Sequence, residues 1–107
     1  MPSPLPTPAG SGSNPPLERS AAEDLARTLR AVADPTRLQL LSVILDSGDG
    51  RATVTQLTEA LGLRQPTVTH HVRILVEDGL LAREPEGKYV WLSVTPDRRP
   101  AIEDLLR

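Results

Sequence analysis

Two glycines end apolar repeats in the middle of the chain. Thr55 begins a segment whose apolar residues have helical spacing, and Gly62 follows it where a left-handed residue can end a helix. The next segment, 65–78, repeats this pattern before Gly79 and points Val68, Val72, Leu75 and Val76 inward. Only the short turn Gly62-Leu63-Arg64 separates the two segments. The stretch 55–79 therefore predicts a helix capped by Thr55, a tight turn and a second helix.

The rest of the chain predicts further helices and one hairpin. The expected elements are a helix over 16–32 capped by Asn14, a helix capped by Asp34 with Pro35 in its first turn, a short strand over 51–54, strands over 80–84 and 88–94 around the turn Pro85-Glu86-Gly87, and a last helix capped by Asp97. The fold class is therefore mainly α with a small β-hairpin (α+β), in the order of a winged helix-turn-helix.

Size and composition exclude several classes of protein. The chain has 107 residues, which suits one domain, and it has no cysteine, which excludes disulfides, thiolate metal sites and thiol catalysis. No apolar run approaches the length of about 20 residues that a membrane span needs. The N-terminal residues lack the basic start and apolar centre of a secretory signal. We expect a soluble, cytoplasmic protein with no membrane partner.

The first residues differ in composition from the rest. Six of the 11 prolines lie in residues 1–16, with glycines and serines among them. Such a segment buries too little apolar surface to offset its ordering entropy. We predict a disordered tail over 1–15 and one folded domain over 16–107, with a proline-rich docking peptide as the alternative for the tail.

Charge placement favours a nucleic-acid partner although total charge does not. The net charge is −2, whereas nucleic-acid-binding domains are often basic. Between Gly62 and Val76, however, no Asp or Glu occurs, and Arg64 and Arg73 make this stretch locally +2. The side of helix 65–78 opposite Val68 is polar, and helix N-termini attract phosphates. An ordinary helical hairpin is the alternative.

The chain resembles the arsenic-repressor (ArsR/SmtB) family of bacterial transcription regulators. The similarity is carried by Leu29-Arg30-Ala31-Val32-Ala33-Asp34-Pro35-Thr36-Arg37-Leu38, Leu57-Thr58-Glu59-Ala60-Leu61-Gly62-Leu63, Gln65-Pro66-Thr67-Val68-Thr69-His70-His71-Val72, Glu77-Asp78-Gly79-Leu80 and Glu86-Gly87-Lys88-Tyr89-Val90-Trp91. Two departures stand out. Arg64 replaces the serine that is usual in the family, and the cysteines that many members have near 53–57 are absent.

The resemblance implies a DNA-binding surface. It places Gln65, Thr67, Thr69 and His70 toward the major groove, with Arg73 nearby. Glutamine can pair with adenine, threonine offers a hydroxyl and a methyl, and histidine can donate to a base or phosphate. Arg64, and Lys88 on the wing 84–90, would contact the DNA backbone. The alternatives are an ordinary surface histidine at 70 and an ordinary solvated lysine at 88. His71 is expected to be buried or to make a structural hydrogen bond.

The resemblance also implies pairing of the first and last helices in a homodimer. Apolar residues on these helices exceed what a core of about 90 residues needs. The expected interface residues are Leu17, Ala21, Leu25, Ile102, Leu105 and Leu106.

The leading hypothesis is a dimeric regulator that binds a double-stranded DNA operator. A winged-helix module that binds protein without binding DNA is the alternative. We expect no enzyme activity, because the chain lacks a plausible catalytic set, and no cofactor. We expect no metal site, because both histidines lie in the DNA-reading helix and carboxylates alone bind Zn or Ni poorly. Control by a small ligand, control by a separate sensor protein and the absence of any effector stay open, as do repression and activation.

Overall fold

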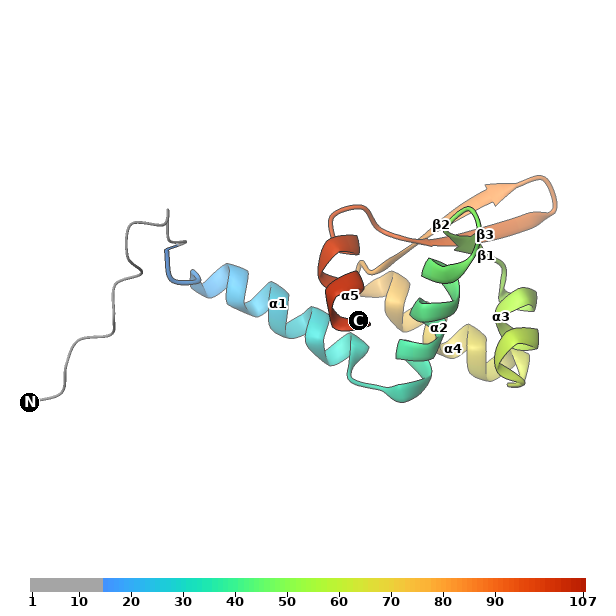
Figure 1. Cartoon of the computed structure of the whole chain (residues 1–107), viewed down its shortest axis with the longest axis horizontal. Coiled ribbons are helices and arrows are strands. Elements are labelled where there is room, and N and C mark those ends of the chain that lie inside the picture. Colours follow the sequence, from blue (N-terminus) through green and yellow to red (C-terminus); the bar gives the residue numbers. More distant parts are fainter. Residues whose placement is uncertain (1–14) are drawn as a thin grey trace, which may run out of the picture.

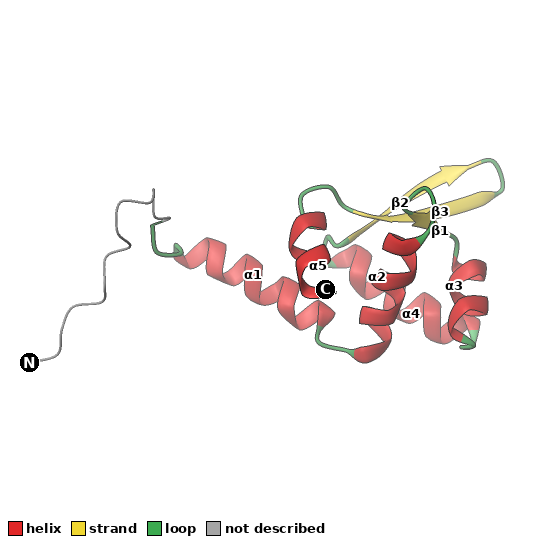
Figure 2. Ribbon diagram, in the orientation of Figure 1, coloured by secondary structure: helices red, strands yellow, loops and turns green. Residues whose placement is uncertain are grey.

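The computed structural model describes residues 15–107, so the expected tail over 1–15 and the Asn14 cap lie almost wholly outside the described residues (Figure 1). The elements of the described part are α1 (Arg19–Val32), α2 (Pro35–Asp46), β1 (Arg51–Ala52), α3 (Val54–Leu61), α4 (Gln65–Glu77), β2 (Leu81–Glu86), β3 (Tyr89–Val94) and α5 (Arg99–Leu105). Figure 2 shows the helices beside a small sheet, which confirms the predicted winged helix-turn-helix. No helix within 15–107 is long and apolar enough to span a membrane.

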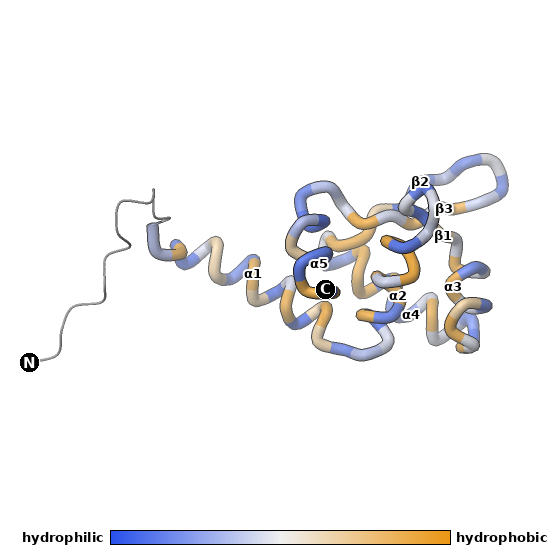
Figure 3. The backbone as a smooth tube through the Cα atoms, viewed as in Figure 1, coloured by the Kyte–Doolittle hydropathy of each residue, from blue (hydrophilic) through white to orange (hydrophobic). Residues whose placement is uncertain are grey.

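The core lies where α2, α3, α4, α5 and the sheet meet. Its fully buried side chains include Leu40, Leu41 and Ile44 of α2, Leu57 of α3, Val68 and Leu75 of α4, Leu92 of β3 and Ile102 of α5. Figure 3 shows hydrophobic residues recurring along α2 and α4, whereas the hairpin tip is mainly hydrophilic. This packing holds α4 with one face inward and the opposite face toward solvent.

The sheet is antiparallel, and its strand order is β1-β3-β2. The hairpin turn is Gly87-Lys88, because Glu86 pairs with Tyr89. The expected turn Pro85-Glu86-Gly87 is wrong, since Pro85 and Glu86 both belong to β2. With a two-residue turn, hydrogen-bonded and non-hydrogen-bonded pairs alternate from Glu86 onward, so the nitrogen of Pro85 points away from β3. A proline is tolerated there because β2 is an edge strand.

Two helix starts are fixed by side-chain caps. Asp34 Oδ1 accepts a hydrogen bond of 3.0 Å from the backbone N–H of Arg37, which confirms the predicted cap of α2 and lowers the pKa of Asp34. The expected cap of α3 at Thr55 is wrong. Thr53 Oγ1 accepts from the N–H of Gln56 at 3.2 Å, and Gln56 Oε1 accepts from the N–H of Thr53 at 3.0 Å. This reciprocal pair satisfies two N–H groups, and only Thr53 has a glutamine three residues later.

The first and last helices begin later than expected. Helix α1 starts at Arg19 and not at 16, and Glu18, at its N-cap, makes no side-chain cap bond. Asp97 does not cap α5, because Thr95 O accepts from the N–H groups of Arg98 and Arg99 at 3.1 and 3.0 Å. Figure 1 shows α1 projecting from the rest of the fold.

Candidate nucleic-acid interface

The turn between α3 and α4 has the predicted geometry. Gly62 has a φ of 65°, which a glycine adopts without strain, and its N–H donates to Thr58 O at 2.9 Å. The inward residues Val68, Val72 and Leu75 of α4 are buried, as expected from their spacing. The turn and these contacts together fix the orientation of α4, with its polar side turned away from the core.

The outer face of α4 carries a shallow depression. Its lining residues are Gln65, Pro66, Thr69, His70 and Arg73. Four of them are exposed and Thr69 is half-buried. Thr67 is also exposed but does not line the depression. The structure thus brings four of the predicted base-contacting and neighbouring side chains together and leaves Thr67 beside them.

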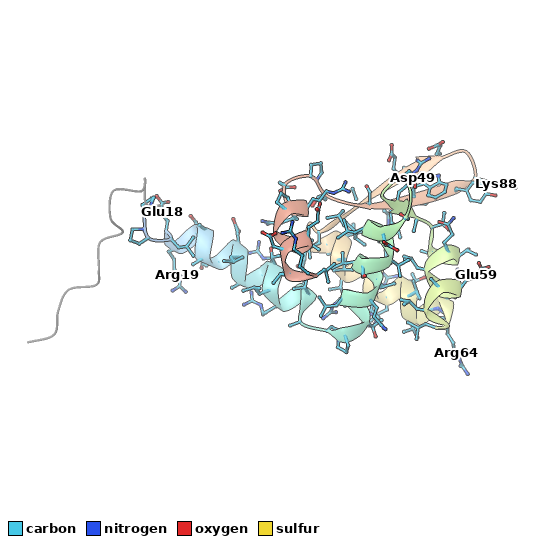
Figure 4. All side chains as sticks on the ribbon, in the orientation of Figure 1. Glu18, Arg19, Asp49, Glu59, Arg64 and Lys88 are labelled. Carbon is cyan, nitrogen blue, oxygen red and sulfur yellow. The ribbon has the colours of Figure 1, made fainter. Side chains whose placement is uncertain are left out.

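The N-terminus of α4 is open to solvent. Arg64 is its N-cap residue and makes no side-chain cap bond, so the first-turn N–H groups have no side-chain acceptor from that residue. Figure 4 shows the Arg64 side chain pointing away from the body. A guanidinium beside the first-turn N–H groups of Gln65 and Thr67 suits an anion, although Pro66 between them has no N–H to donate.

The wing presents a lysine at its tip. Lys88 is the second residue of the turn, and its Nζ lies 5.6 Å from the centre of the Tyr89 ring. Figure 4 shows Lys88 and Arg64 at the end of the molecule farthest from α1. None of the ion pairs within residues 15–107 involves Lys88, Arg64 or Arg73. These three cations are therefore available to an external anion.

The two histidines have different surroundings. His70 is exposed, whereas His71 is half-buried and its Nδ1 is buried without a hydrogen-bond partner among the described residues. The partial burial of His71 agrees with the expectation, but Nδ1 makes no structural hydrogen bond. The two rings lie 5.4 Å apart in an edge-on arrangement. The described part of the chain contains no group of three or more His, Asp or Glu residues that could hold a metal ion.

The expected dimer residues fall into two groups. Leu17, Ala21, Leu25 and Leu105 are exposed, with Leu17 lying before α1 begins. Leu106 is half-buried against the core, and Ile102 is 1% exposed. Ile102 is therefore a core residue and not a free contact surface, which corrects the expectation. Its helical spacing from Leu105 and Leu106 could not reveal that the face of α5 is divided between core and solvent.

Leu29 was not among the expected interface residues, and Arg51 was assigned no role from the sequence. Leu29 is 45% exposed and lies one helical turn after Leu25, so the apolar spacing that selected Leu25 applies to it as well. Arg51 contacts residues in the loop before it and in both strands of the hairpin. No local pattern marks such a residue, because two of its partners, Glu86 and Trp91, are distant in the sequence.

Comparison with known proteins agrees with this geometry. A helix-turn-helix domain family matches residues 32–84. NmtR, an HTH-type transcriptional regulator of Mycobacterium tuberculosis, is 37% identical over 79 residues, covering 74% of this chain and 63% of NmtR. The uncharacterised HTH-type transcriptional regulator MJ1325 of Methanocaldococcus jannaschii is 32% identical over 84 residues, covering 78% of this chain and 92% of that protein. The match thus spans less than two thirds of NmtR but nearly all of MJ1325.

A solved structure has the same fold. The homodimeric winged helix-turn-helix DNA-binding domain of Mb0332 from Mycobacterium bovis, described as a possible ArsR-family transcriptional regulator, superposes with a TM-score of 0.70. The superposition covers 87% of this chain and 86% of that domain at 22% identity. At this identity the likeness concerns the fold.

Proposed function

The chain belongs to the ArsR family of winged helix-turn-helix transcription regulators, and on this premise we propose that it binds double-stranded operator DNA as a homodimer. Helix 65–78 would enter the major groove, and the wing 84–90 would contact the backbone. One observation carries the proposal: the outward face of α4 combines exposed polar side chains with arginines that form no ion pair within residues 15–107, and no acidic residue lies between Gly62 and Val76.

Base recognition is assigned to the depression on α4. Gln65 offers the donor and acceptor that pair with adenine, and Thr69 offers a hydroxyl together with a methyl group that suits thymine. His70 can donate to a base acceptor or a phosphate. Thr67 lies outside the depression and would contact the groove edge. All four side chains have exposed or half-exposed surface in the free protein.

Backbone contacts are assigned to Arg64, Arg73 and Lys88. These side chains are exposed and unpaired within 15–107, so binding a phosphate would not require breaking an existing ion pair. Phosphate contacts of this kind give affinity and orientation rather than sequence preference.

The dimer is assigned to α1 and the exposed part of α5. Leu25 is 42% exposed, Leu29 45% and Leu105 49%. The homodimeric state of the Mb0332 domain supports a homodimer, and the exposed leucines suggest which helices form it. A two-fold interface would present two copies of α4 to half-sites about 34 Å apart.

A direct test is selection of bound sequences from a random double-stranded DNA pool, followed by anisotropy titration of the selected site at several salt concentrations. We expect one enriched inverted repeat, with affinity that falls as salt rises. Failure to enrich any sequence would contradict the proposal. The net charge of −2 and the acids Glu84 and Glu86 on the wing would then favour the protein-binding alternative.

Regulation of this binding stays a prediction. The absence of cysteine and the placement of both histidines on α4 predict that a small ligand or a separate sensor protein, rather than a resident transition metal, controls any response. Calorimetric titration with Zn or Ni ions checks this, since nanomolar binding would contradict it.

A further inference from the structure

The side chain of Arg51 joins three separate parts of the wing region. One terminal nitrogen, Nη1, lies 2.7 Å from Oε2 of Glu86, and Nε lies 2.9 Å from Oδ2 of Asp49. The guanidinium carbon also lies 4.3 Å from the centre of the Trp91 ring. We call these four residues the Arg51 clamp. It connects the loop before β1 to both strands of the hairpin.

The Arg51 clamp lies where the three-stranded part of the sheet ends and the hairpin continues as two strands. Strand β1 has only two residues, and they pair with Ser93 and Leu92. The hairpin continues beyond this point to its turn as two strands, and two-stranded hairpins are marginally stable in water. Near the turn, Tyr89 is 53% exposed, so the hairpin end has little packing of its own.

The register places the clamp on one face of the sheet. Arg51 pairs with Ser93, and Ser93 and Trp91 share a face because side chains alternate along β3. Glu86 pairs with Tyr89, which belongs to the same alternating set. The Arg51 side chain therefore runs from the end of β1 across Trp91 toward the turn, on the face opposite buried Leu92.

The electrostatics of the clamp are mutually favourable. Hydrogen bonds to Glu86 first and then to Asp49 raise the pKa of Arg51, and the hydrogen bond from Arg51 lowers the pKa of Asp49. The Arg51 side chain is only 27% exposed, so its neighbours cover most of its surface. Its planar group can stack on an aromatic ring and hydrogen-bond in its plane at the same time, which lysine cannot do.

We propose that Arg51 is a positioning residue of the wing, holding the hairpin in the orientation in which Lys88 meets the DNA backbone. The proposal rests on the proposed DNA-binding function. In this role Arg51 touches no DNA itself, because its guanidinium is already occupied by two carboxylates and a ring. Its effect on DNA binding passes through the order of the hairpin.

Trp91 provides a readout that needs no DNA, because it is the only tryptophan in the chain. In Arg51→Met the ring loses its guanidinium cover, so we expect stronger acrylamide quenching of its fluorescence. Amide hydrogen exchange across the end of the hairpin should become faster by about fivefold or more. Arg51→Lys should restore only part of the protection. Arg83→Met is the matched control, because it removes the same charge from the hairpin. Arg83 pairs with Leu92 and lies on the other face of β2, so this substitution should leave the quenching of Trp91 unchanged.

A double-mutant comparison then tests the link to DNA. Arg51→Met should weaken binding by about two- to fivefold, and Lys88→Ala should have a smaller effect in the Arg51→Met protein than in the wild type. Glu86→Gln distinguishes the effect of hairpin order on DNA binding from the effect of the wing's negative charge. Removing an acid would tighten DNA binding by electrostatics alone, whereas loss of the clamp would weaken it and expose Trp91.

Three outcomes would overturn the proposal. The first is that Arg51→Met changes neither the acrylamide quenching of Trp91 nor the amide hydrogen exchange of the hairpin, and the second is that Arg51→Met and Lys88→Ala have additive effects on DNA affinity. The third is that Glu86→Gln tightens DNA binding while the quenching of Trp91 stays unchanged. Unfolding of a variant is monitored by circular dichroism, and Arg51→Lys then serves as the milder substitution. If the wild type binds no DNA, the proposed function fails, whereas the quenching and exchange measurements still test whether Arg51 orders the hairpin.

Discussion

Thr53 and Gln56 cap each other across the first turn of α3, with hydrogen bonds of 3.2 and 3.0 Å in opposite directions. Helix α3 leads directly into the turn before α4, the helix proposed to contact DNA. Thr53→Ala should lower the free energy of unfolding by about 1 kcal/mol, because it removes an N-cap acceptor. Thr55→Ala is the control, since Thr55 is exposed and caps nothing. Equal thermal stability of the two variants would show that the cap contributes little.

A second prediction concerns pH and the start of α2. The hydrogen bond from the N–H of Arg37 lowers the pKa of Asp34, so the ionised carboxylate is stabilised in the folded state. Its contribution is present above the unfolded pKa of about 3.9 and is lost as pH falls through the lower folded value. In urea titrations, the difference in unfolding free energy between wild type and Asp34→Ala should shrink from pH 6 to pH 2. A difference that is constant with pH would contradict this.

The base-reading surface gives the third prediction. Thr69→Ala and His70→Ala should each cost about 1 to 3 kcal/mol on the cognate site, with little loss on random DNA. Both side chains point away from the buried Val68 and Leu75, so folding should be retained. Anisotropy titrations on both DNAs measure the contrast. Unchanged cognate affinity in two folded variants would remove α4 from the recognition surface.

Phosphate contacts should behave differently. Arg64→Ala and Lys88→Ala should weaken binding to all sequences alike and reduce the slope of log affinity against log salt by about one unit. The Lys88→Ala variant also tests the alternative that Lys88 is an ordinary surface lysine without a DNA contact. If Lys88→Ala changed neither affinity nor slope while Arg64→Ala changed both, the wing would make no backbone contact.

The fifth prediction concerns association. Leu25→Asp places a charge in the exposed apolar stripe of α1, so it should convert a dimer into a monomer without unfolding the chain, because Leu25 is 42% exposed. Light scattering at micromolar concentration measures the mass. Ala33→Asp, at an exposed position just after α1, is the comparison. A wild type that is already monomeric would end the dimer hypothesis.

Local signals predicted most of the fold. The spacing of Val68, Val72 and Leu75 fixed the inward face of α4, and Asp34 next to Pro35 predicted where α2 begins. Predictions from the sequence failed where two residues could each cap the same helix, and where a side chain contacts residues far away in the sequence. Thr53 and Thr55 both suit a cap, and the choice depends on Gln56.

The candidate site was predicted in the same uneven way. Helical geometry places Pro66, Thr69, His70 and Arg73 of the depression on α4 opposite Val68, whereas Gln65 was named only through the family resemblance. Ile102 was misassigned because its burial depends on how α5 packs against the rest of the fold. Arg51 was missed because Glu86 is 35 residues away in the sequence, and only the folded sheet brings them together.

The position of Pro85 also limits how the wing can associate. Strand β2 is the outer strand of the sheet, and an outer strand with free N–H groups is a template for pairing with a strand of another molecule. Because the nitrogen of Pro85 faces this open edge, the row of donors there is interrupted close to the turn. The hairpin can therefore remain exposed enough to reach a ligand while the edge of β2 offers no continuous row of donors for pairing with a strand of another molecule.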